Sequence, residues 1–397
     1  MKILLLIFLA TSAINLPSEA KVIGRSRNLP HEHCDPAKCL VPNCFCSGID
    51  PPNGLNPSEI PQIVYLTFDG AHTVTTTNLY STIFNGERKN PNGQNISATF
   101  FINHDYNDYS LTHKYWREGH EVALNSITKT TGTYYWQSLN ETGWNREIAD
   151  HRTLVSRFAK IPEADIFGVR APNLQIGGDS MYSALVNSGF RYDSSRPTWM
   201  LRPLLWPYTT DYESIQDCQI EPCPSQSYPG FWVSPLVDLI GSDGQPCAMV
   251  DSCLDAPQTA EETFNLLYKN FKDHYNLYRA PYSLNAQTGW FTNPETPWIL
   301  EGYLRFVDTI LALGDTYIVS IGKGIDWIQN PVTLSNIDKL PSWQPEGLKP
   351  NGCGFAFTCR YEGATLPPEF SGQSRVMKSC FNCPAKYPWL NNPLGQV

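Results

Sequence analysis

The sequence has no cluster of positive charge. Its net charge is −9 at pH 7, and no run of lysine and arginine occurs in the 397 residues. Nucleic acids and anionic membranes both attract proteins through clustered positive charge. The composition therefore argues against both as partners and favours a neutral or cationic ligand.

Long hydrophobic runs are also missing, since a membrane-spanning helix needs about 20 apolar residues and no stretch of that kind occurs. The first residues instead combine Lys2, a short apolar run over residues 3–10 and small residues up to Ala20. This is the pattern of a secretory signal peptide. We predict a signal peptide over residues 1–20, a secreted, extracellular protein and no membrane span. We find no internal repeat and no low-complexity tract.

Cysteine, by contrast, is abundant and occurs as an even number, 12 residues. In an exported protein such sets pair as disulfides, although the sequence does not fix which cysteines pair. Short pairs such as Cys44 with Cys46 and Cys380 with Cys383 also suit zinc, but no two pairs have finger-like spacing. We therefore predict disulfides. Sequons at Asn95 and Asn140 are expected to carry glycans if they are exposed.

The order of elements predicts one large α/β domain. A cysteine-rich N-terminal segment (21–61) precedes a barrel domain (62–340), and a disulfide-stapled extension (341–397) follows it. Short apolar runs predict buried strands, and they alternate with periodic segments that predict helices. This alternation is typical of a parallel sheet covered by helices, as in an irregular (β/α) barrel of seven to eight units with disulfide-pinned loops. The predicted strands are 63–68, 98–102, 121–124, 166–169 and 317–321, and the predicted helices are 77–84, 144–158, 179–188, 260–274 and 297–314. Residues 200–253 break the rhythm and are predicted to form a long insertion.

Several ordered segments identify a family. The chain resembles the polysaccharide deacetylases (carbohydrate esterase family 4, the NodB-homology fold), and within them the chitin deacetylase-like proteins of arthropods. The segments that carry the resemblance are 64–69 (VYLTFD), 88–93 (RKNPNG), 98–101 (ATFF), 119–123 (GHEVA), 170–172 (RAP), 229–232 (PGFW) and 279–281 (RAP). The resemblance implies a NodB-type barrel that binds an extended sugar polymer and uses zinc to remove acetyl groups.

The resemblance also implies which residues stand at the family's metal site. Asp69 takes the position of the general base, and the three ligand positions hold Gly70, Asn125 and Lys129. Glycine has no donor atom, asparagine is a weak neutral ligand, and lysine is a cation that repels Zn²⁺. We therefore expect no zinc cofactor. A relocated metal site of Asp69 with His72, and metal-free chemistry by Asp69 with Lys129, stay open as alternatives.

The family's acid is also replaced. Gln287 takes the position of the histidine that protonates the leaving amine, and glutamine gives up no proton at neutral pH. Arg170 is the equivalent of the arginine that orients the base. Asp193 is the equivalent of the aspartate that orients the acid, and we expect it to have lost its partner.

The resemblance leaves a sugar-binding cleft as the remaining function. Its expected lining is Trp232, Tyr282, Leu284 and Trp290, and Asn173 replaces an aromatic residue of the family at one wall. The favoured interpretation is a secreted, catalytically inactive homologue that binds chitin or a related N-acetylglucosamine polymer. The alternatives are an active or weakly active chitin deacetylase, and a structural matrix protein without sugar binding. The sequence does not indicate an oligomeric state.

Overall fold

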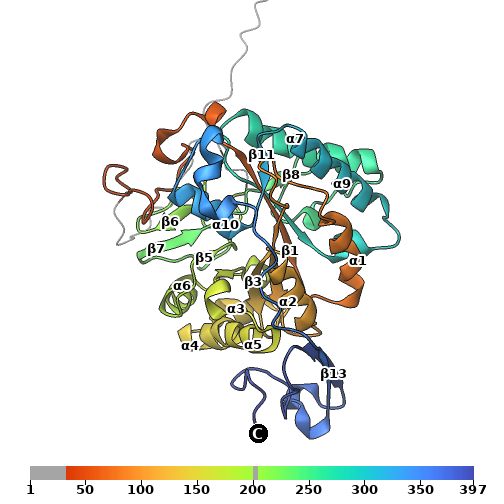
Figure 1. The fold of residues 1–397 in the computed structure, drawn as a ribbon. Coiled ribbons are helices and arrows are strands. Elements are labelled where there is room, and N and C mark those ends of the chain that lie inside the picture. Colours follow the sequence, from red (N-terminus) through yellow and green to blue (C-terminus); the bar gives the residue numbers. More distant parts are fainter. Residues whose placement is uncertain (1–32, 200–203) are drawn as a thin grey trace, which may run out of the picture.

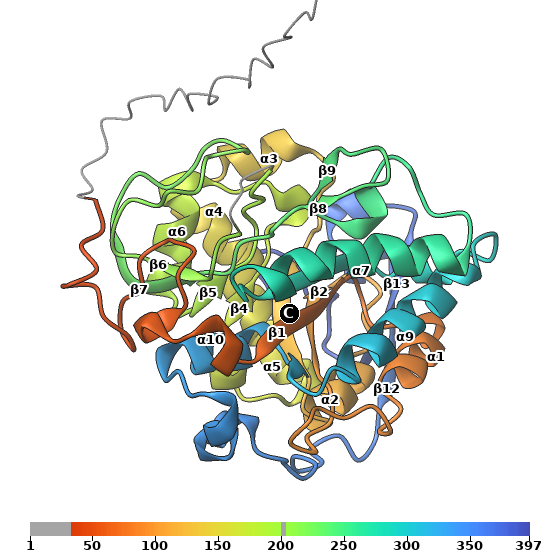
Figure 2. The same ribbon diagram turned by 90° about the horizontal axis from the view of Figure 1, so that it is seen from above.

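Parallel strands wrapped by helices form the larger part of the protein (Figures 1 and 2). The computed structural model describes residues 33–199 and 204–397. The predicted signal peptide over 1–20 and the start of the N-terminal segment lie outside these residues.

The main sheet has nine strands in the order β10-β1-β2-β3-β4-β5-β7-β6, with β11 also paired to β1. Every described ladder in it is parallel except the one between β6 and β7. No ladder closes the sheet between β6 and β10 within the described ranges. The predicted α/β fold with a curved, irregular parallel barrel is therefore confirmed. The strands are β1 (Gln62–Asp69), β2 (Ala98–Asn103), β3 (Glu121–Ser126), β4 (Gly168–Val169), β5 (Tyr192–Asp193), β6 (Tyr208–Thr210), β7 (Tyr228–Val233), β10 (Tyr282–Gln287) and β11 (Thr316–Ile318).

Most of the helices cover the outer side of this sheet (Figure 2), whereas α10 packs against the inner-face side chains Ile63 and Tyr65. Each predicted helix is present, with small shifts at its ends, and the 144–158 segment contains a π-helical turn (Asn145–Ala149). The predicted strand 317–321 ends early, at Ile318, because Ser320 caps the next helix by accepting a hydrogen bond from the Lys323 backbone N–H. The helices are α1 (Val74–Ile83), α2 (Tyr109–Arg117), α3 (Thr133–Ser138), α4 (Glu141–Trp144), α5 (Asp150–Ala159), α6 (Gly178–Asn187), α7 (Ala260–Asn276), α8 (Gly289–Thr292), α9 (Trp298–Leu311) and α10 (Ile321–Gln329).

Strand alternation divides the buried residues of β1 between two cores. Leu66 and Phe68 belong to the large cluster that packs against the helices, whereas Ile63 and Tyr65 belong to a second cluster with Phe101 and the α10 side chains. Successive side chains of a strand point to opposite faces of the sheet. The second cluster therefore fills the barrel interior, and Thr67 and Asp69 follow on the same face at the carboxyl end of β1.

The segment 200–253 is more than the insertion that its composition predicts. It supplies β6 and β7 to the main sheet, and β7 pairs in parallel with β5. Only its loops are pinned locally, by Cys218–Cys223 and Cys247–Cys253, next to the short hairpin of β8 (Leu239–Ile240) and β9 (Pro246–Cys247).

All twelve cysteines lie in six disulfides, which confirms that prediction. In the N-terminal segment the bridges are Cys34–Cys46 and Cys39–Cys44. This segment lies along β6, where Thr209 donates its backbone N–H to the Phe45 carbonyl at 2.9 Å. It thereby covers a sheet edge that would otherwise expose unpaired backbone groups.

The C-terminal extension forms a hairpin of β12 (Phe357–Glu362) and β13 (Ser374–Ser379), stapled by Cys353–Cys380 and Cys359–Cys383. It lies on the outer side of α2 and α5 (Figure 1). Its backbone reaches the barrel where the Cys380 N–H donates to the Phe158 carbonyl at 2.8 Å.

Among the described residues, no helix has the length and apolar character needed to cross a membrane.

The contact between α7 and α9 depends on Gly302. A Cβ on this residue would overlap the Ala260 carbonyl oxygen and lie 2.6 Å from the Thr263 Cβ. Because backbone cannot move as a flexible side chain does, Gly302→Ala should lower the free energy of unfolding by about 1–3 kcal/mol in urea titrations. Gly289→Ala is the matched control, since nothing lies within 4 Å of its Cβ position. Equal stability of the two variants would contradict this packing.

Candidate functional site

The residues at the family's base and acid positions lie side by side. In the ladder between β1 and β10, Asp69 pairs with Gln287, so both stand at the carboxyl ends of parallel strands. The Asp69 side chain is 11% exposed, and Gln287 is exposed. Functional side chains of β/α barrels gather at this end of the strands.

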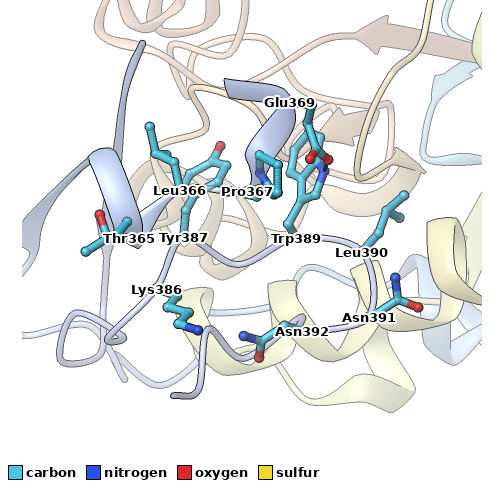
Figure 3. A pocket seen from close by; sticks show the side chains of 12 residues that line it. Thr365, Leu366, Pro367, Glu369, Lys386, Tyr387, Trp389, Leu390, Asn391 and Asn392 are labelled. Carbon is cyan, nitrogen blue, oxygen red and sulfur yellow. Dashed lines mark hydrogen bonds between the residues drawn. The ribbon is translucent and has the colours of Figure 1, made fainter. Parts of the chain in front are cut away.

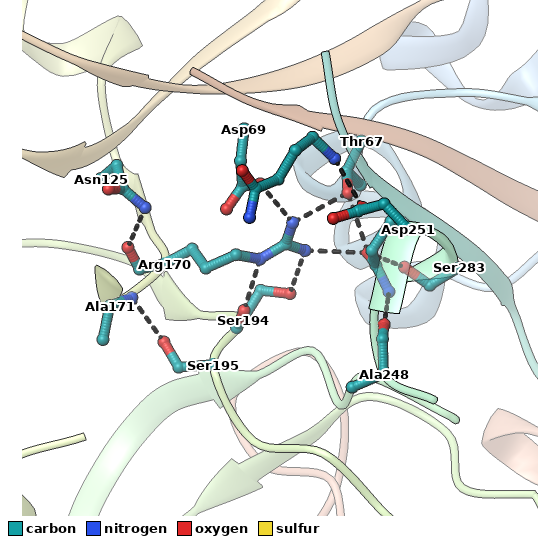
Figure 4. A network of polar contacts seen from close by, with 12 residues as sticks. Thr67, Asp69, Asn125, Arg170, Ala171, Ser194, Ser195, Ala248, Asp251 and Ser283 are labelled. Carbon is teal, nitrogen blue, oxygen red and sulfur yellow. Dashed lines mark hydrogen bonds and ion pairs between the residues drawn. The ribbon is translucent and has the colours of Figure 1, made fainter. Parts of the chain in front are cut away.

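A buried arginine organises this end of the barrel (Figure 4). Arg170 is fully buried, and its Nη1 lies 2.7 Å from Asp69 Oδ1. The same guanidinium donates to Thr67 Oγ1, to the carbonyl and hydroxyl of Ser194, and to Asn285 Oδ1, at 2.8–3.1 Å. Its flat face covers the Phe101 ring, 4.0 Å from the ring centroid. Each donor of this buried cation that meets an acceptor offsets the large cost of removing the charge from water.

Asn285 joins the strand ends together. Its Oδ1 accepts hydrogen bonds from Thr67, Ser283 and Arg170, and its Nδ2 donates to the Ala248 carbonyl. The sequence alone predicts no role for Thr67, Ser194 or Asn285. A signal is present for the two strand residues, because Thr67 and Asp69 in β1 and Ser283, Asn285 and Gln287 in β10 are polar at every second position, whereas Ser194 lies beyond the end of β5.

Asp251 is a further carboxyl group at the site that sequence reasoning missed. It lies on the loop closed by Cys247–Cys253, and its Oδ1 accepts the Gln287 backbone N–H at 2.8 Å. Burial raises the pKa of Asp251, the charge of Asp69 raises it further, and the charge of Lys129 lowers it. The site thus combines two carboxyl groups with the cations Arg170 and Lys129.

Asp193 has partners, contrary to the expectation that loss of the acid leaves it without one. It is fully buried, and it accepts hydrogen bonds from the Ser195 hydroxyl and from the Tyr182 hydroxyl, the latter at 3.0 Å. Burial raises the pKa of Asp193, and these two hydrogen bonds partly offset the increase. The carboxyl group is therefore integrated into the fold at β5 and α6.

The three ligand positions lie in three different environments. Gly70 has a φ of 137°, a conformation that L side chains rarely adopt. Asn125 is buried and donates to the Arg170 carbonyl at 3.1 Å, while its Oδ1 has no partner. Lys129 has a φ of 46°, and its backbone N–H donates to the Ser126 hydroxyl. Asn173, at the wall that carries an aromatic residue in the family, donates to the Thr131 carbonyl at 3.1 Å.

These groups do not fit zinc. The metal prefers thiolate, imidazole or carboxylate ligands in a tetrahedral set, whereas the three positions offer one unpaired amide oxygen and a cation. In the described part of the chain, only Cys34, Cys39 and Cys46 bring three His, Cys, Asp or Glu ligand atoms close together. Those sulfurs are all in disulfides, so they supply no thiolate.

His72 occupies a hydrophobic environment. Its ring is fully buried and packs against Tyr80, Phe100 and Tyr115, with centroid distances of 4.8–5.9 Å. Nδ1 lies 3.0 Å from the Thr112 hydroxyl, and burial lowers the pKa of His72 to about 3. These contacts give His72 a packing role, and they provide no third ligand for a relocated metal site with Asp69.

Most of the expected cleft lining lies in the core instead. Tyr282 and Leu284 are each 1% exposed and face the helices, because the inward positions of β10 belong to Ser283 and Asn285. Trp232 is also 1% exposed and fills the barrel interior. Trp290 alone of the four is partly exposed, with its ring against Phe291.

Comparisons with known proteins show which family the chain belongs to. No protein-family model matches the chain. Chitin deacetylase 8 of Bombyx mori is 36% identical over 366 residues, which cover 91% of this chain and 93% of the relative. Chitin deacetylase 1 of the same organism is 34% identical over 376 residues, covering 91% of this chain and 68% of the relative.

The chain belongs to the chitin deacetylase family. Among solved structures, the chitin deacetylase of the fungus Colletotrichum lindemuthianum is similar, with 13% identity, a TM-score of 0.35, and coverage of 66% of this chain and 87% of that one. Within the chitin deacetylase family, Gly70, Asn125, Lys129 and Gln287 are departures from the residues that the family resemblance implies.

The hydrogen bonds of Arg170, called here the Arg170 network, should be a main source of stability at the carboxyl ends of the strands, which form the mouth of the barrel. Arg170→Met leaves the Asp69 carboxylate and several buried acceptors unpaired, and we expect a loss of about 3–5 kcal/mol in the free energy of unfolding. Arg305→Met removes an exposed ion pair with Glu261 and serves as the control, with little change expected. A loss for Arg170→Met no larger than the control's would contradict the network's role.

The charges of Lys129 and Asp251 should be coupled. Because Lys129 lowers the pKa of Asp251, Lys129→Met should raise that pKa further, as followed by carboxyl NMR shifts across a pH titration. A carboxyl group whose pKa is raised in the folded state stabilises the protein at low pH, and this stabilisation is lost as the pH rises through that pKa. The variant should therefore be less stable than the natural protein mainly at pH values above the folded-state pKa of Asp251. Lys114→Met, on the exposed side of α2, should leave the titration of Asp251 unchanged. An unchanged or lower pKa in Lys129→Met would show that the two groups do not interact.

Proposed function

We propose that this member of the chitin deacetylase family is a secreted protein without deacetylase activity, which binds chitin or a related polymer of N-acetylglucosamine. The observation that carries the proposal is the set of side chains at the ligand and acid positions: Gly70, Asn125, Lys129 and Gln287. None of them is a thiolate, an imidazole or a carboxylate.

The chemistry of deacetylation explains why these four residues matter. Hydrolysis of an amide at neutral pH needs an activated water, a stabilised oxyanion and an acid for the leaving amine. In this family zinc would supply the first two, and a histidine the third. Here Asp69 is paired with Arg170, and no residue at the acid position can donate a proton. We infer that the chain holds no zinc.

Two observations, one on the site and one on the relatives, support a neutral polymer as ligand. The carboxyl groups of Asp69 and Asp251 are matched in number by the cations Arg170 and Lys129, so no excess charge attracts an ion. The family's chitin deacetylases act on a neutral polymer, and the Bombyx mori relatives bear that name.

Three features support secretion. Six disulfides are typical of a protein from an oxidising compartment, and residues 1–20 have the pattern of a signal peptide. Both sequon asparagines, Asn95 and Asn140, are exposed. A glycosylated protein of the extracellular space accounts for all three.

Zinc content and acetate release test the proposal together. The purified protein, incubated with Zn²⁺ and then dialysed, should contain substoichiometric zinc by mass spectrometry. It should release no acetate from chitin oligomers above the buffer, while it sediments with chitin beads. A variant with Gly70→Asp, Asn125→His, Lys129→His and Gln287→His, in which the backbone of residue 70 has to leave its φ of 137°, should take up zinc and release acetate.

The matched control carries Gln287→His alone, which restores an acid without a metal and should stay inactive. Acetate release by the natural protein would contradict the proposal and identify a deacetylase with unconventional chemistry. Failure to sediment with chitin would instead support a structural protein without sugar binding.

A further inference from the structure

The C-terminal extension contains a hollow, shown in Figure 3, whose lining residues all belong to the extension. Its volume is about 390 Å³, and it opens between residues 364–369 and the terminal loop 386–392. Hollows of this size hold small organic molecules such as one or two sugar units.

The floor of this hollow is aromatic. Tyr387 and Trp389 are buried, with ring centroids 5.8 Å apart and planes inclined by 30°. Their polar atoms already have partners, since the Tyr387 hydroxyl donates to Asp105 at 3.0 Å and Trp389 Nε1 donates to Glu369 at 2.6 Å. Because Tyr387 is 1% and Trp389 is 7% exposed, the two rings support the hollow from beneath, and the apolar surface open to a ligand comes mainly from the partly exposed Leu366 and Leu390.

The rim of the hollow is polar and balanced in charge. Glu369, Lys386 and Asn391 are all exposed there and supply a carboxylate, an ammonium group and an amide. Such groups donate to and accept from hydroxyl groups, and one negative charge beside one positive charge favours a neutral ligand. A sugar ring combines apolar C–H faces with neutral hydroxyl groups at its edge. The lining therefore suits a neutral saccharide better than an ion or a purely apolar molecule.

The extension brings this hollow to the same end of the sheet as Asp69. It docks on the loop that follows β2, where Arg375 pairs with Asp105 and Lys378 pairs with Asp108, at 3.1 and 3.2 Å. The Tyr387 ring lies against the His104 ring on that loop. Because β1 and β2 are parallel neighbours, this loop leaves the sheet at the carboxyl end, as Asp69 does.

We propose that the hollow is a second saccharide-binding site, which takes one or two units of a neutral, β-linked N-acetylated sugar chain. This site would bind the polymer independently of the site at Asp69. The choice of sugar rests on the proposed function, whereas the site itself rests on the floor, rim and position of the hollow.

Calorimetric titration of the full chain with the chitin disaccharide and hexasaccharide tests the site. The pocket variant carries Lys386→Ala and Asn391→Gly, and glycine keeps the left-handed backbone of residue 391, whose φ is 64°. We expect it to bind the disaccharide about tenfold more weakly, since two hydrogen-bonding groups are lost. The matched control is Arg360→Ala, which removes an exposed cation of β12 outside the hollow.

A barrel variant separates the two proposals. Gln287→Trp places an indole beside Asp69 and should obstruct the barrel mouth without touching the extension. If it binds the disaccharide as tightly as the natural protein while the pocket variant binds it about tenfold more weakly, the second site is established, and the barrel is not needed for that binding. If the pocket variant binds as tightly as the natural protein, the second site is refuted, and loss of binding in Gln287→Trp would then leave the proposed function standing. If the natural protein binds no saccharide at all, both proposals fail, and the hollow serves another kind of partner, such as a peptide.

Discussion

The buried guanidinium of Arg170 is the group on which the mouth of this barrel depends. It joins side chains from β1, β10 and the segment after β5, and its N–H groups donate to Thr67, Asp69, Ser194 and Asn285. An arginine suits this role because its planar donors diverge in fixed directions. Removing the cation would break hydrogen bonds at the ends of β1 and β10 and after β5 at the same time. The network therefore fixes the positions of Asp69 and Asn285 together.

The same network holds the site residues in place through contacts within the protein. Asp69 is held by a protein cation, and Lys129 lies close enough to Asp251 to lower the pKa of that carboxyl group. A metal ion would be an additional positive charge among groups that are already matched. We infer that the charges of the side chains balance one another because the zinc ligands of the family are replaced. We also infer that the fold has kept a binding function.

The sequence predicts the architecture well and the orientation of side chains less well. Apolar runs and helical periodicity locate most elements, but a strand buried on both faces carries no signal of which face points inward. Tyr282 and Leu284 were therefore assigned to the cleft, although Ser283 and Asn285 hold the inward positions. The role of Asp251 had no local signal either, because its neighbours Asp69 and Lys129 lie far away along the chain.

The central claim is that no metal binds beside Asp69, and anomalous diffraction tests it most directly. Crystals grown with excess Zn²⁺ would be measured on both sides of the zinc absorption edge. The account predicts no anomalous peak within coordination distance of Asp69, Asn125 or His72. A peak there, at full occupancy, would contradict it and show that the site holds a metal with ligands outside the family's pattern.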